Sequence, residues 1–227
     1  MKFLVYGLVA LSLLVMGTPA MAKVEVTGDA YLNYSSMYLW RGFNLSDSNP
    51  VLQGGMDLSF SGLTISYWSN YQIDGTEMDE TDLTVDYSYK ASDLVTLNVG
   101  NILYSITGPD TSEVYAGVSL DTFLSPSLTV YYDYDLFDGD VYVAGSIGHS
   151  FDLQDNLTVN LGALVSYVDN DSYSDLHNAE LSAGLDYKVN DQITLSPAVV
   201  FSTPLSDKAD DVIDQEFMGG LTLNLSF

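Results

Sequence analysis

The chain has 227 residues, with 31 Asp plus Glu against 6 Lys plus Arg, a formal net charge of −25 at pH 7 and no cysteine. This balance excludes nucleic acid as a partner, because phosphate contacts need clustered basic residues, and the lack of cysteine excludes disulfides and thiolate sites. Hydrophobic residues still make up 47% of the chain, so the chain is expected to fold with its charged and apolar groups in separate places.

The first segment, residues 1–22, has the composition of a targeting signal. Lys2 is followed by an apolar run from Phe3 to Met16 and then by small residues that end at Ala22. This order is typical of a secretory signal peptide, and the apolar run is short for a membrane-spanning helix. We predict cleavage after Ala22 and a mature domain of residues 23–227; an uncleaved anchor helix is the alternative.

From residue 24 onward the dominant pattern is an alternation of apolar and polar residues with a period of two, which indicates β-strands. In one stretch, for example, Leu83, Val85 and Tyr87 share one face, and Thr84 and Asp86 share the other. The pattern predicts twelve strands, the first of which could continue as far as Arg41. The predicted spans are 24–34, 51–60, 63–69, 81–89, 94–104, 113–120, 127–134, 141–151, 157–167, 179–189, 193–201 and 215–227.

The connections between these strands alternate in length. Odd-numbered strands lead into long segments such as "STPLSDKADDVID", and even-numbered strands lead into short ones such as "SG" and "NDQ". An even strand number with short turns at one end and longer loops at the other is typical of a transmembrane antiparallel β-barrel. We therefore predict an all-β, up-and-down barrel of about 12 strands in the outer membrane of a Gram-negative bacterium, with both termini periplasmic.

Tyrosines recur near the strand ends on the apolar face. A tyrosine has an apolar ring and a polar tip, which suits the two interfaces of a membrane; cross-strand aromatic pairing in a soluble sheet is the alternative. The residues are Tyr34, Tyr67, Tyr87, Tyr89, Tyr132, Tyr134, Tyr167 and Tyr187.

The opposite face carries carboxylates and no lysine. Carboxylates in a dry interior would be costly without partners, so this face is expected to line a hydrated, acidic lumen that favours cations. The inferred lumen residues are Asp29, Asp57, Asp82, Asp86, Asp133, Glu180, Asp186 and Glu216, together with Glu25 and Glu113.

The stretch "YLWRGFNLSDSNPVLQGGMDLSFSGLTISYWSN", residues 38–70, resembles the start of the TorF-type porins, a proteobacterial outer-membrane family. The ending "LTLNLSF" is also similar to the terminal strand of outer-membrane barrels, and this resemblance implies that Phe227 is part of the signal read by the barrel-assembly machinery. The residues that carry the first resemblance are Tyr38, Arg41, Gly42, Ser46, Pro50, Gln53, Gly54, Trp68 and Asn70.

Arg41 is the single arginine of the chain. Continued alternation along the first strand places it on the lumen side near the outer mouth, where its guanidinium can pair with wall carboxylates. Gly42 lets the chain turn sharply after it. Two interpretations stay open: Arg41 clasps the first loop to the wall, or it constricts the pore.

Motifs for catalysis, cofactors or metals are weak, and we predict no enzyme activity, no cofactor and no dedicated metal site. A hydrolase would need His177, expected in an outer loop, together with Ser172 or Ser174. The acidic run "DNDSYSD" lacks the glycine and closing Glu of a calcium loop. Loose binding of divalent cations could still bridge the acidic loops to lipopolysaccharide and outer-membrane lipid.

Two functions follow from this reading. The first is a porin-like channel with a narrow, acidic, cation-preferring lumen for small solutes. The alternative is a filled structural or binding barrel that acts through its acidic extracellular loops. Twelve strands lie between the small filled barrels and the wide open ones, so the strand number is compatible with both.

Overall fold

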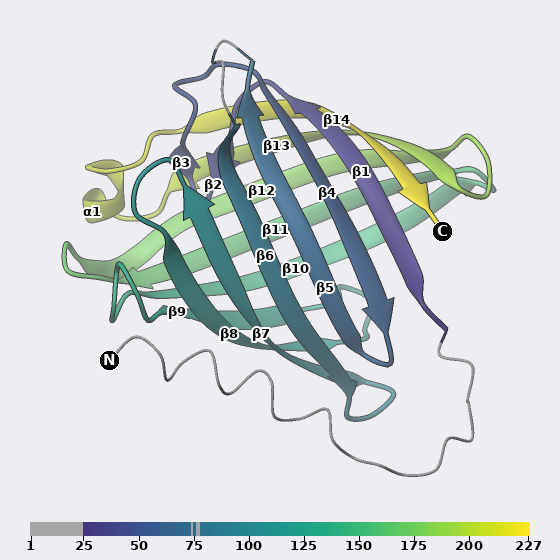
Figure 1. The fold of residues 1–227 in the computed structure, drawn as a ribbon, viewed down its shortest axis with the longest axis horizontal. Helices are drawn as coiled ribbons and strands as arrows, with labels where there is room; N and C mark the ends of the chain where they lie inside the picture. The colour runs from purple at the N-terminus through teal and green to yellow at the C-terminus, as the bar shows by residue number, and fades with distance from the viewer. Residues whose placement is uncertain (1–24, 74, 76–77) are drawn as a thin grey trace.

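The computed structural model describes residues 25–73, 75 and 78–227, and the predicted signal peptide lies outside this range. The described residues form a closed barrel of antiparallel strands (Figure 1). The barrel strands are β1 (Thr27–Ser35), β4 (Val51–Phe60), β5 (Leu63–Gln72), β6 (Met78–Lys90), β7 (Val95–Ile106), β8 (Thr111–Leu120), β9 (Ser127–Asp133), β10 (Val141–Gln154), β11 (Leu157–Asp169), β12 (Ser174–Lys188), β13 (Ile193–Pro204) and β14 (Glu216–Ser226).

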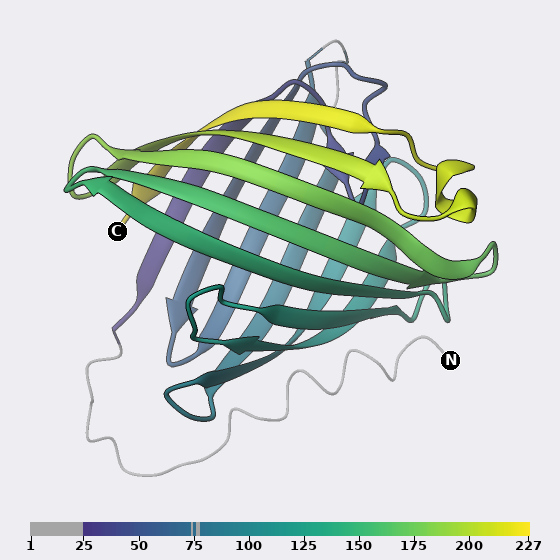
Figure 2. The ribbon, with the colours of Figure 1, turned by 180° about the vertical axis from the view of Figure 1, so that it is seen from behind.

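Each barrel strand pairs with its sequence neighbours in an up-and-down order. The sheet runs β1-β14-β13-β12-β11-β10-β9-β8-β7-β6-β5-β4 and closes where β1 pairs with both β14 and β4. Figure 2 shows the long strands β10 to β13 on the side opposite to β4 and β5. The prediction of a twelve-stranded antiparallel barrel is therefore confirmed.

The twelve predicted strands are all present, and the differences lie at their ends. The prediction that β1 could continue to Arg41 is wrong, because β1 ends at Ser35 and the chain then forms a separate hairpin of β2 (Leu39–Trp40) and β3 (Phe43–Asn44). β12 begins at Ser174, five residues before the predicted start of that strand at 179. Ladder pairing with Val168 and Asp169 extends β12 there.

The two ends of the barrel differ. One end, called here the long-loop end, carries segments 36–50 and 205–215, the second of which contains the short helix α1 (Asp207–Asp210) (Figure 1). The other, the short-turn end, includes the turn at Ser61 and Gly62, whose φ angles of 51° and 85° fit the type I′ geometry favoured in two-residue hairpins. No helix among the described residues has the length and apolar character needed to cross a membrane.

Both ends of the described chain lie at the short-turn end. The backbone N–H of Gly28 donates to the carbonyl of Phe227, and the N–H of Phe227 donates to the carbonyl of Gly28, both at 2.8 Å. A side chain at position 28 would meet the ring of Phe227, so the glycine leaves room for the terminal ring against β1.

The outer face of the barrel is apolar and the inner face is not. All eight tyrosines predicted on the apolar face are exposed, from Tyr167 at 38% to Tyr89 at 56%. Leu, Ile and Val side chains on the same face are 40% or more exposed at many positions, including Leu83, Val85 and Leu181. Contiguous apolar surface of this extent needs an apolar environment around it.

Candidate functional site

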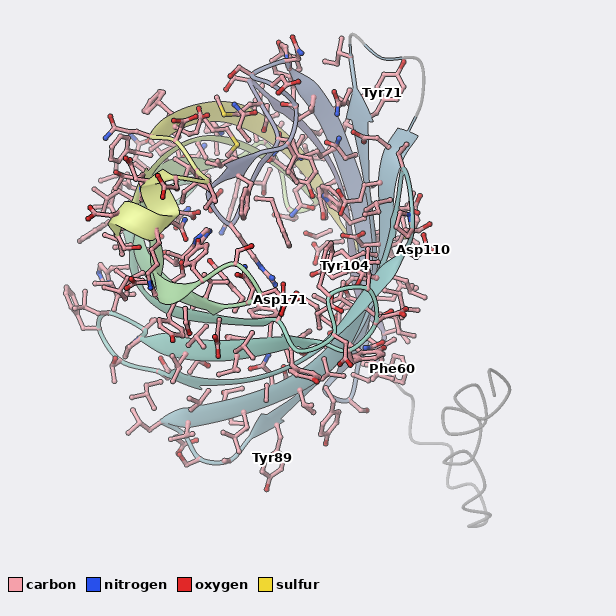
Figure 3. All side chains as sticks on the ribbon, turned by 90° about the vertical axis from the view of Figure 1, so that its left-hand side faces the viewer. Phe60, Tyr71, Tyr89, Tyr104, Asp110 and Asp171 are labelled. Carbon is pink, nitrogen blue, oxygen red and sulfur yellow. The ribbon has the colours of Figure 1, made fainter. Side chains whose placement is uncertain are left out.

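A hairpin at the long-loop end packs against side chains of the barrel wall. Tyr38, in the segment that leads into β2, is only 6% exposed, and its ring lies 5.5 Å from that of Trp68 on β5. Trp40 on β2 lies 6.3 Å from Tyr104 on β7. Figure 3, which looks into this end, shows Tyr104 inside the barrel and Tyr89 on its outside. The hairpin therefore folds inward against the wall.

The turn of this hairpin explains why a glycine follows the arginine. Trp40 pairs with Phe43 across a two-residue turn in which Arg41 has φ 50° and Gly42 has φ 86°. Positive φ at both central residues is the type I′ geometry, which normally favours Asn-Gly. A non-glycine residue held there carries backbone strain of about 1 kcal/mol or more, so other contacts must hold Arg41 in place.

The strongest of these contacts is a two-bonded ion pair with Glu113 on β8. Nη1 of Arg41 donates to Oε1 of Glu113 at 2.8 Å, and Nη2 donates to Oε2 at 2.7 Å. The hydroxyl of Tyr104 donates to the same Oε2 at 2.9 Å. The side chains of Arg41 and Glu113 are only 14% and 8% exposed. Such a parallel pair fixes the orientation of the guanidinium as well as its charge.

Aromatic rings surround the guanidinium on its remaining sides. Its central carbon lies 4.5 Å from the ring centre of Trp40, 4.6 Å from that of Tyr131 and 4.3 Å from that of Tyr142. Rings at this distance attract a cation through their negative faces. Burial has the largest single effect and lowers the pKa of Arg41, but the hydrogen bonds and charge of Glu113, together with Tyr104 and Tyr142, raise it by more, so the net pKa is raised. Arg41 is therefore a charged group in an aromatic cage.

His177 holds the backbone of the same turn. Its Nε2 donates to the carbonyl oxygen of Arg41 at 2.8 Å, which leaves Nδ1 to accept from the hydroxyl of Tyr173. The prediction that His177 lies in an outer loop is wrong, because β12 extends over it and it is 2% exposed. With both ring nitrogens engaged, His177 is not paired with Ser172 or Ser174 as a hydrolase would require.

The eight predicted lumen carboxylates lie on the face opposite to the exposed apolar residues, and most accept hydrogen bonds from neutral groups. Asp86 accepts from Tyr115 at 2.8 Å, and Asp186 accepts from Asn160 at 2.7 Å and from Ser196 at 2.6 Å. One side-chain oxygen of Asp82, Oδ1, is buried without a hydrogen-bond partner among the described residues.

Four of the remaining predicted carboxylates also accept hydrogen bonds from neutral side chains. Asp133 accepts from Thr111 at 2.6 Å. Glu180 accepts from Asn178 at 2.9 Å, Glu216 from Asn44 at 3.0 Å, and Asp29 from Ser226. Asp57 lies opposite Asp29 and Ser66 in the ladder. Of the predicted set, therefore, only Arg41 meets an ion-pair partner, and that partner is Glu113.

The three described lysines lie away from these carboxylates. Lys90 pairs with Asp93, and Lys208 pairs with Asp175; both lysine side chains are more than half exposed. Lys188 ends β12 at the short-turn end and is exposed. No group of three or more His, Asp or Glu residues in the described ranges is arranged to hold a metal ion.

A cavity of about 400 Å³ opens beside Arg41. It is lined by rings from the hairpin and the wall, including Trp40, Phe43 and Tyr104, and by Phe137 from the loop between β9 and β10. Carboxylates of Glu80 and Asp140 also reach it, together with Glu113 and Asp133. The lining therefore combines aromatic surface with an excess of negative charge.

One local sequence pattern indicates the hairpin at this site, although the strand prediction did not include it. "WRGF" places a glycine in a two-residue turn between aromatic residues, which is a hairpin pattern. The choice of Glu113 among the wall carboxylates, and the inward position of His177, have no comparable local signal.

Comparison with solved structures shows that this barrel fold is shared with porins. The chain is similar to the NanC porin, with a TM-score of 0.61 and 15% identity over 88% of this chain and 98% of that one. It is similar to the KdgM porin, with a TM-score of 0.58 and 15% identity over 88% and 99%. An outer-membrane channel described as COG4313, from Pseudomonas putida F1, gives a TM-score of 0.56 and 10% identity over 90% and 96%.

No protein-family model matches the sequence, and no curated protein matches it significantly. At these identities the structural likeness establishes the fold. The assignment of residues 38–70 to the TorF-type porins stays a prediction.

Proposed function

We propose that the chain is an outer-membrane channel with a narrow, acidic lumen that passes small solutes and prefers cations over anions. The observation that supports the proposal is that the inner carboxylates, apart from Glu113, have no basic partner among the described residues. Asp86 and Asp186 are held by neutral donors, and the three described lysines are exposed at strand ends and loops. The field inside the barrel is then negative, and carboxylates in a pore attract cations.

Arg41 does not reverse this field. Its charge is matched by Glu113 at 2.7 Å, so the pair is close to neutral when seen from a distance. The other inner carboxylates keep their excess. We therefore assign Arg41 to the clasp that holds the hairpin and, because the hairpin lies inside the barrel, to the narrow part of the path as well.

The location and assembly of the barrel belong to the same proposal. The exposed apolar outer face suits a membrane, and the pairing of Gly28 with Phe227 brings the two ends of the described chain together at the short-turn end. In an outer-membrane barrel the short turns face the periplasm, so both termini would be periplasmic. Phe227 would be presented to the barrel-assembly machinery, and the acidic loops would face lipopolysaccharide.

We infer no catalytic activity for the chain, since the side chain of His177 is committed to the backbone of Arg41 and to Tyr173. The second candidate function is a filled barrel that binds through its loops. The inward hairpin favours it, because Tyr38 and Arg41 occupy the interior near one mouth.

The deciding experiment is a measurement of single-channel currents from the refolded mature chain in a planar bilayer. In a KCl gradient we expect a reversal potential of the sign set by K⁺, with a bias that shrinks as salt rises, because the Debye length falls from about 30 Å at 0.01 M to about 3 Å at 1 M. A reversal potential set by Cl⁻ would contradict the cation preference. A protein that is folded but carries no current would favour the filled barrel.

A further inference from the structure

The cavity beside Arg41 has the properties of a ligand site. Its volume of about 400 Å³ falls within the range of about 300–1,000 Å³ found for small-molecule pockets. It lies at the long-loop end, where the hairpin, the β9–β10 loop and the wall strands meet. Arg41 and Glu113 are themselves part of its lining.

The charges of the lining select the sign of a ligand. Glu80, Glu113, Asp133 and Asp140 all reach the cavity, and Arg41 is the single permanent cation among the lining residues. The positive charge of Arg41 is compensated by the carboxylate of Glu113. Glu80, Asp133 and Asp140 then have no cationic partner among the described residues, so an anion would be repelled and a cation attracted.

The rings of the lining select the chemical class. Most of the exposed lining is apolar, and it includes the rings of Trp40, Phe43, Tyr104 and Phe137. A hydrated metal ion gains little from such surface, and the described residues offer no cluster of metal ligands. An organic cation gains from both features, since its charge faces ring faces and carboxylates while its apolar part leaves water.

The molecule already holds one cation of this kind in the same place. The guanidinium of Arg41 lies 4.3–4.6 Å from three ring centres, and two of those rings, Trp40 and Tyr142, also line the cavity. The aromatic environment at this mouth is therefore one in which a charged nitrogen group is stabilised.

We propose that this cavity binds small organic cations that carry an apolar group, such as an aromatic or alkyl ammonium. The binding stands on the cavity alone. That such cations are also the preferred permeants rests on the channel function proposed above, and it would place this site at the entrance to the path.

The experiment is calorimetric titration of the refolded mature chain in detergent micelles with three probes of one shape. These are benzylammonium, neutral benzyl alcohol and the benzoate anion, each corrected by titration into protein-free micelles. We expect saturable binding of benzylammonium, weaker binding of benzyl alcohol and none of benzoate. Equal binding of benzylammonium and benzyl alcohol would mean an apolar cavity without charge selection and would overturn the proposal, as would no binding.

Two loop substitutions test the location. Phe137→Ala removes a ring from the lining and Asp140→Asn removes a charge; each should weaken benzylammonium binding by about two- to fivefold, the size of a partly exposed cation–π or charge contribution. The matched controls are Phe123→Ala and Asp121→Asn in the segment 121–126 at the short-turn end, which should leave binding unchanged. If the two pairs behave alike, the site is not this cavity.

The outcome is separable from that of the channel experiment. Binding without current would remove the channel and keep the site. Current with K⁺ preference but without benzylammonium binding would keep the channel and remove the site.

Discussion

Arg41 and Glu113, 72 positions apart in the chain, meet inside the barrel through two hydrogen bonds of 2.8 and 2.7 Å. The pair joins the turn of the inward hairpin to strand β8. Because Arg41 has a strained φ of 50°, the ion pair and the bond from His177 to its carbonyl hold the turn together. The hairpin is thus fastened to β8 and β12 at once.

The first prediction concerns this fastening. Glu113→Gln should lower stability by about 3–5 kcal/mol, because it leaves a buried guanidinium without its counter-charge. Cleavage by proteases between Gly42 and Pro50 should rise, and the folded band on unboiled gels should convert to the unfolded one at a lower temperature. Lys208→Ala, which breaks an exposed pair with Asp175, is the control and should cost less than about 1 kcal/mol.

Arg41→Ala tests the clasp and the constriction in two assays, proteolysis of the hairpin and single-channel conductance. Loss of the clasp raises proteolysis of the hairpin, and loss of a constriction raises the single-channel conductance. We expect both proteolysis and conductance to rise, because the guanidinium lies inside the barrel and forms the ion pair with Glu113. An Arg41→Ala protein with wild-type proteolysis and wild-type conductance would remove both roles.

The second prediction concerns cation preference. Neutralising Asp57, Asp86 and Asp186 together to Asn removes three inner carboxylates that have no basic partner among the described residues. The reversal potential in a KCl gradient should move toward zero, most clearly at low salt. The control is Asp93→Asn with Asp175→Asn, which removes exposed carboxylates paired with lysines. A triple variant with the selectivity of the wild type would show that these carboxylates do not line the path.

The third prediction concerns the width of the lumen. The ring of Tyr115 lies over Gly100, in the space that a side chain at position 100 would occupy. Gly100→Ala should push the ring inward, break its 2.8 Å bond to Asp86 and lower the conductance. Gly219→Ala adds the same methyl group at a position with no atom within 4 Å and should leave conductance unchanged. Equal conductance in the two variants would place Tyr115 away from the narrow part.

The fourth prediction is a pH dependence at Asp140, in the loop before β10. Burial, followed by the charge of Asp171, raises the pKa of Asp140; Asp133 and Asp169 also face it. A raised carboxyl pKa means that the folded state binds the proton more readily than the unfolded state, so the charged form costs stability at neutral pH.

Asp140→Asn should therefore raise the unfolding temperature at pH 7, and this gain should shrink as the pH falls through the raised pKa and the wild-type carboxyl becomes neutral. Asp171→Asn is the companion variant: it removes one cause of the raised pKa, so adding Asp140→Asn to it should give a smaller gain. A gain that is constant with pH would mean that the charge of Asp140 is not its cause.

The fifth prediction concerns closure and location. Phe227→Ala removes the ring that packs beside Gly28, and Gly28→Val fills the space that the ring and the carbonyl of Asp57 occupy. Each should slow barrel closure, seen as a smaller fraction of heat-modifiable protein in the outer-membrane fraction. The wild-type chain should fractionate with the outer membrane, and its recovery as a soluble periplasmic protein would contradict the proposed location.

The sequence by itself determined the barrel wall. Alternation with a period of two is a local property of a strand. Leu83 and Val85 could therefore be assigned to one face, and Asp86 to the other, before any strand pairing was known. Twelve such strands with alternating connection lengths then left few ways to arrange them. The same local information failed between Ser35 and Arg41, where the chain leaves the wall and alternation stops being informative.

Only the tertiary structure decided which side chains fill the interior and which of them contact one another. Ten carboxylates were inferred to share the inner face, and nothing local distinguishes Glu113 from the others as the partner of Arg41. His177 meets the carbonyl of Arg41 across 136 positions, a contact that exists only because closure brings β12 and the hairpin together. The alternation of a strand fixes the face on which a side chain lies, whereas the neighbour it meets across the lumen depends on the register and closure of the whole sheet.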